Sequence, residues 1–175
     1  MKFRFILTLM SLSSLLFASA PGEPLKVGDA APAVTGVTET GAKLALTDVY
    51  GKQPYTLVYF YPKADTPGCT KQGCSLRDGY EALTKLGVTV IGVSHDDVAA
   101  QKAFKEKYHL PFTLIADMDK TLINAFGVPT TMPLTDMAHR SAYLIKGGKI
   151  IYTDYKGTTT EQAETILKVI AEQKV

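Results

Sequence analysis

The sequence predicts a single α/β domain in which a mixed central sheet is flanked by helices. Short apolar, β-branched runs alternate with longer amphipathic stretches through the middle of the chain, and two adjacent strand patterns followed by a helix end it. The chain has 175 residues, of which 46% are hydrophobic and 21% charged, so it is large and apolar enough to bury one substantial core. No internal repeat or low-complexity tract suggests a second domain.

The beginning of the chain differs in composition from the rest. A basic start with Lys2 and Arg4 precedes a mostly apolar run, and small residues occupy positions 18–20. We therefore predict a secretory signal peptide over residues 1–20 and one mature domain over residues 21–175. The mature protein is expected to be exported, in a bacterium to the periplasm, without stable membrane association. The alternative is an uncleaved amphipathic anchor.

The charge balance gives no indication of a polyanionic partner. Removing residues 1–20 would remove two basic residues and no acidic one, which leaves equal numbers of both in the mature chain. We expect neither nucleic acid nor an anionic membrane as a partner.

The first part of the mature chain predicts an irregular start, a hairpin and a buried strand. Residues 25–34 contain Gly, Asp and Pro and read as a lead-in. Partial alternation over residues 34–46 predicts a small β-hairpin, and residues 48–51 predict a turn. The run Tyr55–Tyr61 is apolar, β-branched and aromatic, which is typical of a strand buried on both faces.

A helix is predicted from Cys69 to about Leu86, with Gly87 ending it. Its apolar residues are spaced for one buried face: Leu76, Tyr80, Leu83 and Leu86.

The middle of the chain continues the alternation of strands and helices. Residues 88–94 and 112–116 predict buried strands, and residues 98–108 predict an amphipathic helix between them. A short helix is expected over residues 120–126. Residues 129–139, with two prolines and several threonines, predict a loop.

The end of the chain predicts a hairpin and a closing helix. Strands over residues 141–145 and 149–153 flank two glycines, and a helix over residues 160–172 begins with Thr160 as its expected cap. This order of elements is that of a thioredoxin-like fold.

The candidate reactive group is a thiol at the start of the first long helix. Pro67 and Gly68 make a turn that delivers Cys69 into the first helical turn, where unpaired N–H groups and the positive end of the dipole favour a thiolate. Cys74 is the other cysteine of the chain. In an oxidising compartment the pair is either a structural disulfide or a redox pair that cycles.

The residues around Cys69 match a known pattern. The run Pro62-x-x-x-Thr66-x-x-Cys69 resembles the active-site signature of the peroxiredoxins, and a second cysteine five positions on, Cys74, resembles their Q subfamily, the bacterioferritin comigratory proteins. The resemblance extends over nearly all of the chain after residue 24. It implies a thioredoxin-like fold and a thiol-dependent peroxidase that acts on hydrogen peroxide and organic hydroperoxides without a cofactor.

The resemblance also implies the roles of the two cysteines. Cys69 would attack the peroxide and become a sulfenic acid, and Cys74 would convert that sulfenic acid to a disulfide. An outside dithiol, thioredoxin or a thioredoxin-like protein, would then reduce the disulfide. We expect a monomer or weak dimer.

Pro62 and Thr66, which precede Cys69, each have a structural and a catalytic interpretation. The hydroxyl of Thr66 suits either a helix cap or a hydrogen bond to a peroxide oxygen. Pro62 suits simple strand termination, and the resemblance implies that it also shields the thiolate.

Two arginines are candidates for the cation that faces the sulfur. Arg140 starts a predicted strand and matches the second arginine of the family pattern, so the resemblance implies that it holds the thiolate and the peroxide oxygens; otherwise it reads as a surface residue. Arg77 lies eight positions after Cys69, about 12 Å along a helix, and is expected to pair with Asp78 or solvent.

Three other functions remain as alternatives. An exported thioredoxin-like disulfide reductant or isomerase usually has Cys-x-x-Cys, and a copper-delivery protein usually has Cys-x-x-x-Cys with a distant histidine, here His139. The third is a non-enzymatic domain with a structural disulfide. The spacing of Thr66 to Cys69 favours the peroxidase, and the histidines have no metal-ligand spacing.

Overall fold

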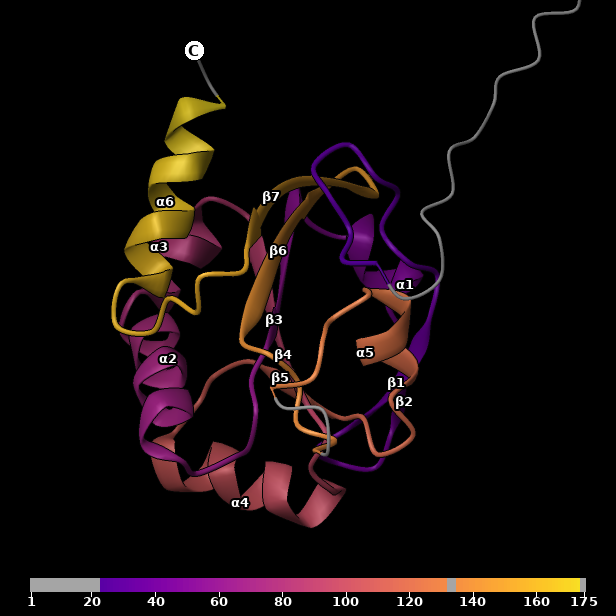
Figure 1. Cartoon of the computed structure of the whole chain (residues 1–175). Coiled ribbons are helices and arrows are strands. Elements are labelled where there is room, and N and C mark those ends of the chain that lie inside the picture. Colours follow the sequence, from indigo (N-terminus) through magenta and orange to yellow (C-terminus); the bar gives the residue numbers. More distant parts are fainter. Residues whose placement is uncertain (1–22, 132–134, 174–175) are drawn as a thin grey trace, which may run out of the picture.

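The computed structural model of the chain describes residues 23–131 and 135–173 (Figure 1). The signal peptide predicted over residues 1–20 lies outside the described residues. In the described part no helix has both the length and the apolar character needed to cross a membrane.

The centre of the molecule is a seven-stranded mixed sheet with the order β2-β1-β5-β4-β3-β6-β7. β3 pairs in parallel with β4 and β4 in parallel with β5, whereas the remaining pairs are antiparallel. The strands are β1 (Thr35–Thr38), β2 (Lys43–Ala45), β3 (Tyr55–Phe60), β4 (Val88–Ser94), β5 (Thr113–Ala116), β6 (Ser141–Lys146) and β7 (Lys149–Asp154).

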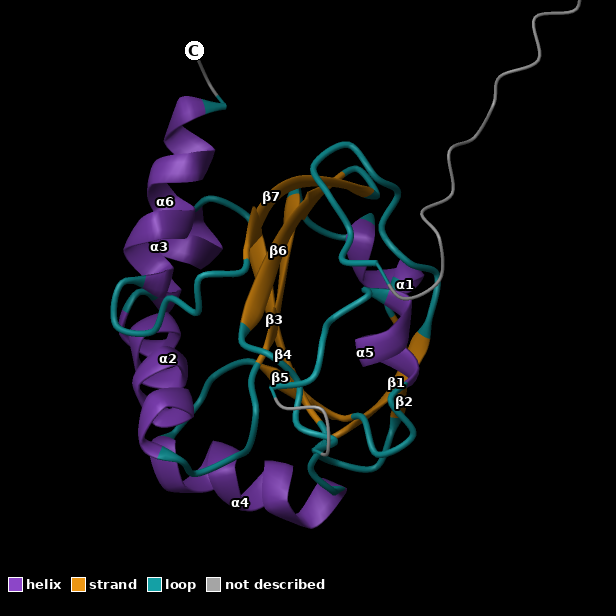
Figure 2. Ribbon diagram, in the orientation of Figure 1, coloured by secondary structure: helices purple, strands orange, loops and turns teal. Residues whose placement is uncertain are grey.

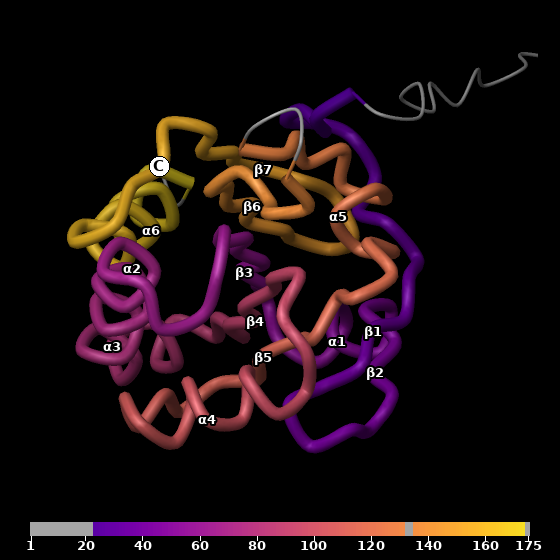
Figure 3. Tube along the Cα trace, turned by 60° about the horizontal axis from the view of Figure 1, so that its bottom comes forward, coloured from indigo at the N-terminus to yellow at the C-terminus, as the bar shows by residue number. Residues whose placement is uncertain are grey.

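Helices cover both faces of this sheet (Figure 2). The helices are α1 (Thr47–Tyr50), α2 (Pro67–Asp78), α3 (Tyr80–Lys85), α4 (Val98–Tyr108), α5 (Thr121–Ala125) and α6 (Gln162–Glu172). α2, α3 and α6 lie on one face and α1 and α5 on the other; α4, at the bottom of the view, packs into the core on the side of α2 (Figure 1). The view in Figure 3 shows α6 beside α2, and the two helices are in contact.

β3 separates two hydrophobic cores. All six of its residues are buried, and alternate side chains point to opposite faces, because successive residues of a strand do so. Leu57 and Tyr59 pack with α2, α3, α4 and α6, whereas Val58 and Phe60 pack with α1 and α5. Both faces of β3 are therefore covered, as its continuous apolar run predicts.

The predicted α/β architecture with a mixed sheet is confirmed, and three local predictions are wrong. The helix expected from Cys69 to Leu86 is two helices, α2 and α3, separated at Gly79. The turn expected over residues 48–51 is one turn of helix, α1. Thr160 does not cap the closing helix, which begins at Gln162 without a side-chain cap.

Candidate active site

The segment between β3 and α2 is fixed by contacts to neighbouring elements. Pro62 ends the strand run and is half-buried. Ala64 donates its backbone N–H to Asp96 Oδ2 at 2.7 Å, which ties the segment to the end of β4. Asp65 has a left-handed backbone conformation, with φ of 58°, and turns the chain toward the start of α2.

The carboxylate of Asp65 holds this turn against the end of α4. Lys107 Nζ donates to it at 2.7 and 2.9 Å, and the Tyr108 hydroxyl donates at 2.5 Å. These hydrogen bonds lower the pKa of Asp65, and the bond from Lys107 contributes more than the bond from Tyr108. Nothing local in the sequence indicates that Asp65 is bound by residues at the end of a helix more than forty positions on.

Cys69 is the third residue of α2, as predicted for a thiol in the first turn of this helix. Pro67 occupies the first helical position, where its missing N–H costs nothing. The Cys69 side chain is buried, with 1% exposure. The N–H groups of this turn have no intrahelical acceptor, so the thiol lies at the positive end of the helix.

Arg140 is the cation that faces the sulfur. Its Nη2 donates to Cys69 Sγ at 3.4 Å, although 71 residues separate the two in sequence. Gly68 leaves room for this approach, because a Cβ at that position would lie 3.0 Å from Arg140 Nη2, a tight contact. The assignment of Arg140 over Arg77 as the arginine beside Cys69 agrees with the geometry.

Two buried glutamines hold the arginine in place. Arg140 Nη1 donates to Gln72 Oε1 at 2.6 Å, and Gln72 Nε2 donates to Gln162 Oε1 at 2.9 Å. Both glutamine side chains are fully buried. The guanidinium is therefore shared between the thiol and an amide, and the amide is fixed in turn by α6. The sequence does not predict a role for either glutamine, because without knowledge of the tertiary contacts a glutamine in a helix is expected to be exposed.

Thr66 lies at the N-cap position of α2, but its side chain does not cap the helix. Its hydroxyl donates to the backbone oxygen of Lys63 at 2.9 Å, and no N–H of the first turn is bonded to it. Of the two interpretations of Thr66, the helix cap is therefore not the one that the structure has. The hydroxyl oxygen keeps its acceptor sites, and rotation about the C–O bond would let it donate to another oxygen.

Cys74 lies on the same regular helix as Cys69 and is half-buried, and both thiols are free. Ideal helical geometry puts Cα atoms five residues apart at about 8.6 Å. A disulfide needs about 4.4–6.8 Å. A structural disulfide is therefore incompatible with α2 as it stands, and a bond between the two cysteines requires the helix to unwind.

Arg77 is held elsewhere, as predicted. Its Nε donates to Asp78 Oδ1 at 2.9 Å, and its Nη1 donates to the backbone oxygen of Tyr108 at 2.9 Å. It thus pairs with Asp78 and bonds an end carbonyl of α4.

Tyr59 lies beneath the site in the core shared by β3 and α2. Its pKa is raised well above the usual value, mainly by burial and further by Tyr61 and by the charge of Cys69. The hydroxyl is therefore neutral at any physiological pH and adds no negative charge that would oppose a thiolate.

The copper-delivery alternative needs a ligand set that the described residues do not form. No three of their histidine, cysteine, aspartate and glutamate side chains are placed to share a metal ion. His139, the candidate ligand, lies beside Arg140 with its ring Nδ1 buried.

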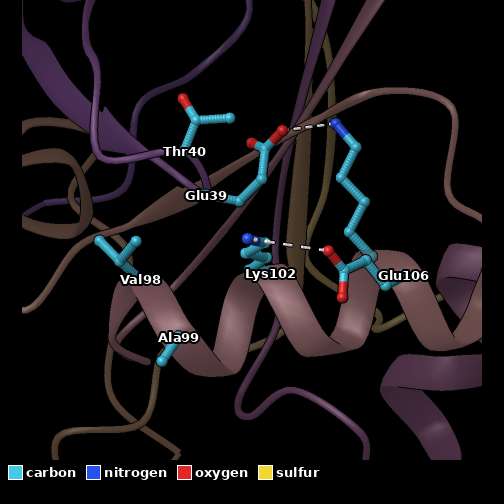
Figure 4. Close-up of a pocket in the computed structure, with 7 residues that line it drawn as sticks. Glu39, Thr40, Val98, Ala99, Lys102 and Glu106 are labelled. Atoms are coloured by element: carbon cyan, nitrogen blue, oxygen red, sulfur yellow. Dashed lines mark hydrogen bonds and ion pairs between the residues drawn. The ribbon is translucent and has the colours of Figure 1, made fainter.

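A pocket whose lining contains neither Cys69 nor Cys74 lies beside α4 (Figure 4). It has a volume of about 780 Å³ between α4 and the turn after β1, and its lining includes Glu39, Lys102, Lys105 and Glu106. Glu39 pairs with Lys105, and Lys102 with Glu106. The carboxylate of Glu39 also accepts the Leu114 N–H at 3.0 Å. These charges are paired with one another, and no reactive nucleophile lines the pocket.

Comparison with known sequences gives consistent matches. The family model described as the AhpC/TSA family matches residues 27–153. A putative peroxiredoxin bcp of Coxiella burnetii is 49% identical over 104 residues, which cover 59% of this chain and 68% of that protein. The peroxiredoxin Bcp of Escherichia coli K12 is 42% identical over 156 residues, which cover 85% of this chain and 97% of that protein. The chloroplastic peroxiredoxin Q of japonica rice is 42% identical over 125 residues, 71% of this chain and 57% of that protein.

Solved structures agree with the sequence matches. A PrxQ variant of Xylella fastidiosa superposes with a TM-score of 0.80 and 26% identity, over 88% of this chain and all of that one. The peroxidoxin BcpB of Mycobacterium tuberculosis gives a TM-score of 0.78 and 25% identity, over 85% of this chain and 97% of that one. The thioredoxin-like fold expected from the order of elements is confirmed.

Proposed function

The chain belongs to the AhpC/TSA family, among the peroxiredoxin Q and Bcp proteins, and from this premise we propose that Cys69 reduces hydroperoxides and Cys74 completes each cycle. Membership makes the protein a thiol-dependent peroxidase. The observation that carries the assignment to Cys69 is the contact of 3.4 Å between Arg140 Nη2 and Cys69 Sγ at the start of α2. A thiolate there is favoured both by the arginine and by the helix terminus.

In the first step the Cys69 thiolate attacks one oxygen of the hydroperoxide. The S–O bond forms as the O–O bond breaks, and the other oxygen leaves as hydroxide or alkoxide and takes a proton. Negative charge then spreads over two oxygens, and Arg140 is placed to stabilise it. Hydrogen peroxide and small organic hydroperoxides are the proposed substrates.

In the second step the Cys74 thiolate attacks the sulfur of the Cys69 sulfenic acid. The S–S bond forms, the S–O bond breaks, and hydroxide leaves and takes a proton to become water. An external dithiol, thioredoxin or a thioredoxin-like protein, then reduces the disulfide by thiol–disulfide exchange.

A peroxide-consumption assay tests the activity. With purified protein, dithiothreitol as reductant and hydrogen peroxide as substrate, we expect catalytic consumption well above the rate of the reductant alone. Absence of turnover with hydrogen peroxide, tert-butyl hydroperoxide and cumene hydroperoxide would reject the proposed substrates.

Arg140 is expected to act mainly on the first step. Arg140→Ala should slow the reaction of Cys69 with hydrogen peroxide by about 100-fold, because it removes the donor that faces the developing charge. Arg77→Ala should change the same rate by less than about twofold, since Arg77 is bonded to Asp78 and the end of α4. Stopped-flow measurement of peroxide reduction compares the two variants; equal effects would show that Arg140 is not the activating arginine.

Disulfide formation is expected to unwind the first half of α2. Two buried polar atoms there or against it, Thr70 Oγ1 and Gln162 Nε2, have no hydrogen-bond partner among the described residues. An incompletely satisfied polar network makes this part of the helix a weak point. The oxidised protein should therefore lose some helical circular dichroism and show faster amide exchange over residues 69–80, with the largest increase in the first half of α2, up to residue 74. Matching exchange in both redox states, with the disulfide verified, would contradict the switch.

Gly73→Ala provides a matched test of the same unwinding. A Cβ at Gly73 would lie 3.5–3.6 Å from Leu110 and Phe104, which is ordinary contact. Alanine favours the helix by about 1 kcal/mol over glycine. Disulfide formation should then slow by up to about fivefold, while peroxide reduction by Cys69 stays within about twofold of wild type.

The cellular setting is part of the proposal. Export to the periplasm rests on the composition of residues 1–20, and it would require a periplasmic thioredoxin-like reductant. Fusing residues 1–30 to alkaline phosphatase, which is active only after export, tests this: the fusion should be active, and deletion of the apolar run should abolish its activity. A monomer or weak dimer is proposed, and sedimentation of both redox states would test it.

A further inference from the structure

Cys74 has a charged neighbour of its own on α2. Arg77 lies three residues further along the same helix, and side chains at this spacing share one face, with Cβ atoms about 5–6 Å apart. Arg77 is half-buried, with 34% of its side chain exposed. Arg77 therefore lies on the face of α2 that carries Cys74, and its side chain is not fully extended into solvent.

Contacts outside the unwinding segment fix the Arg77 guanidinium. Its Nη1 bonds the backbone oxygen of Tyr108, at the negative end of α4, and Asp78 lies 2.8 Å from its Nη2. The second half of α2 is itself anchored: Leu76 is fully buried, and Ser75 Oγ accepts the Ala163 N–H of α6 at 3.3 Å. When the first half unwinds, Arg77 is held in place beside Cys74.

The electrostatics agree with this placement. The pKa of Arg77 is raised, first by its hydrogen bond to Asp78 and further by the charges of Cys74 and Asp78. The Arg77 cation and the Cys74 sulfur are therefore neighbours on one face of α2.

We propose that Arg77 is the electrostatic partner of Cys74, promoting its attack on the Cys69 sulfenic acid, while Arg140 promotes the attack of Cys69 on peroxide. The inference rests on the proposed role of Cys74. Arg77 makes the thiolate form of Cys74 available. The thiolate is oxidised as the S–S bond forms, the Cys69 sulfur is reduced as its S–O bond breaks, and hydroxide leaves as water after protonation. Asp78 opposes Arg77 by neutralising part of its charge.

A pair of substitutions separates this role from a structural one. Arg77→Met and Asp78→Asn break the same ion pair, so a purely structural pair would give effects in the same direction. We expect opposite effects: Arg77→Met should slow disulfide formation about threefold to fivefold, and Asp78→Asn should accelerate it about twofold, as for one partly screened charge. Arg77→Lys should keep more than half of the wild-type rate.

Lys71→Met is the matched control. Lys71 is also three residues from Cys74 on α2, but it is exposed and lies in the half of the helix that unwinds. Its charge is screened by water, so its removal should change disulfide formation by less than about 1.5-fold.

Rapid-quench alkylation followed by intact mass measurement separates the reduced, sulfenic and disulfide forms of the full chain after one equivalent of hydrogen peroxide. The compared quantity is the ratio of the rate of disulfide formation to the rate of sulfenic acid formation in each variant.

Equal ratios in Arg77→Met and wild type, or shifts of the same sign in Arg77→Met and Asp78→Asn, would overturn the inference. If Arg77→Met does not fold, a slower or unchanged ratio in Asp78→Asn would overturn it. A wild type that stops at the sulfenic acid would reject the role of Cys74 itself, and one that forms no sulfenic acid would reject the peroxidase proposal.

Discussion

Cys69→Ser is expected to lower peroxide turnover by at least about 1,000-fold. A serine hydroxyl is almost wholly protonated near neutral pH and reacts poorly with peroxide, even at a helix N-terminus beside an arginine. The substitution replaces a buried sulfur by a smaller oxygen and leaves Arg140 and Gln72 in place. The loss should therefore be chemical and not a consequence of unfolding.

The measurement is peroxide consumption with dithiothreitol, together with thermal unfolding of the same sample. Cys74→Ser is the matched control, because dithiothreitol can reduce a sulfenic acid directly and should sustain turnover in that variant. If Cys69→Ser folds normally and retains more than a few per cent of wild-type turnover, another residue carries the reaction.

Much of the fold follows from local pattern. The apolar runs of β3 and β4 predict two strands buried on both faces, and a parallel pair between them follows from the helices that connect them. The hairpin of β6 and β7 follows from its two glycines. These strands are predictable because most of each strand is buried, so that its sequence is apolar over most of its length.

The break between α2 and α3 is not predictable in this way. A Cβ at Gly79 would lie 2.6 Å from the Cβ of Ala163, so the glycine is needed where α6 crosses closely. That contact joins residues 84 positions apart and leaves no local trace. The start of α6 is hard to predict for a related reason: its first residue, Gln162, is directed into the core, where it accepts a hydrogen bond from Gln72.

In the candidate active site, too, some features have local sequence signals and others depend on tertiary packing. The turn before Cys69 predicts a thiol at a helix start, since Pro67 and Gly68 are local signals. Arg140 reads from pattern alone as a surface residue, and only the family resemblance predicts its place beside the Cys69 sulfur. The support behind it, Gln72 and Gln162, depends on how α2, α6 and the start of β6 pack together, which no single segment encodes.

Cys74→Ser is expected to separate the two halves of the cycle. Serine cannot form a disulfide, so after one equivalent of peroxide Cys69 should remain as the sulfenic acid, while its formation keeps the wild-type rate. Turnover with a thioredoxin-like dithiol protein should fall at least about tenfold, because such a reductant acts on a disulfide. Cys74 is half-buried on α2, and the exchange of sulfur for oxygen there should cost about 1 kcal/mol of stability or less.

Intact mass and dimedone labelling measure the trapped species. The treated variant should gain the mass of one oxygen atom, and dimedone should label it at Cys69, whereas wild type should lose two hydrogen atoms to the disulfide. Excess peroxide should carry the variant on to the sulfinic acid, which wild type largely escapes because Cys74 removes the sulfenic acid first. Amide exchange over residues 69–80 should remain slow in the peroxide-treated variant, since no bond draws the helix open. A variant that gains no oxygen and binds no dimedone, or one that cycles with the dithiol protein at the wild-type rate, would mean that Cys74 does not resolve the sulfenic acid.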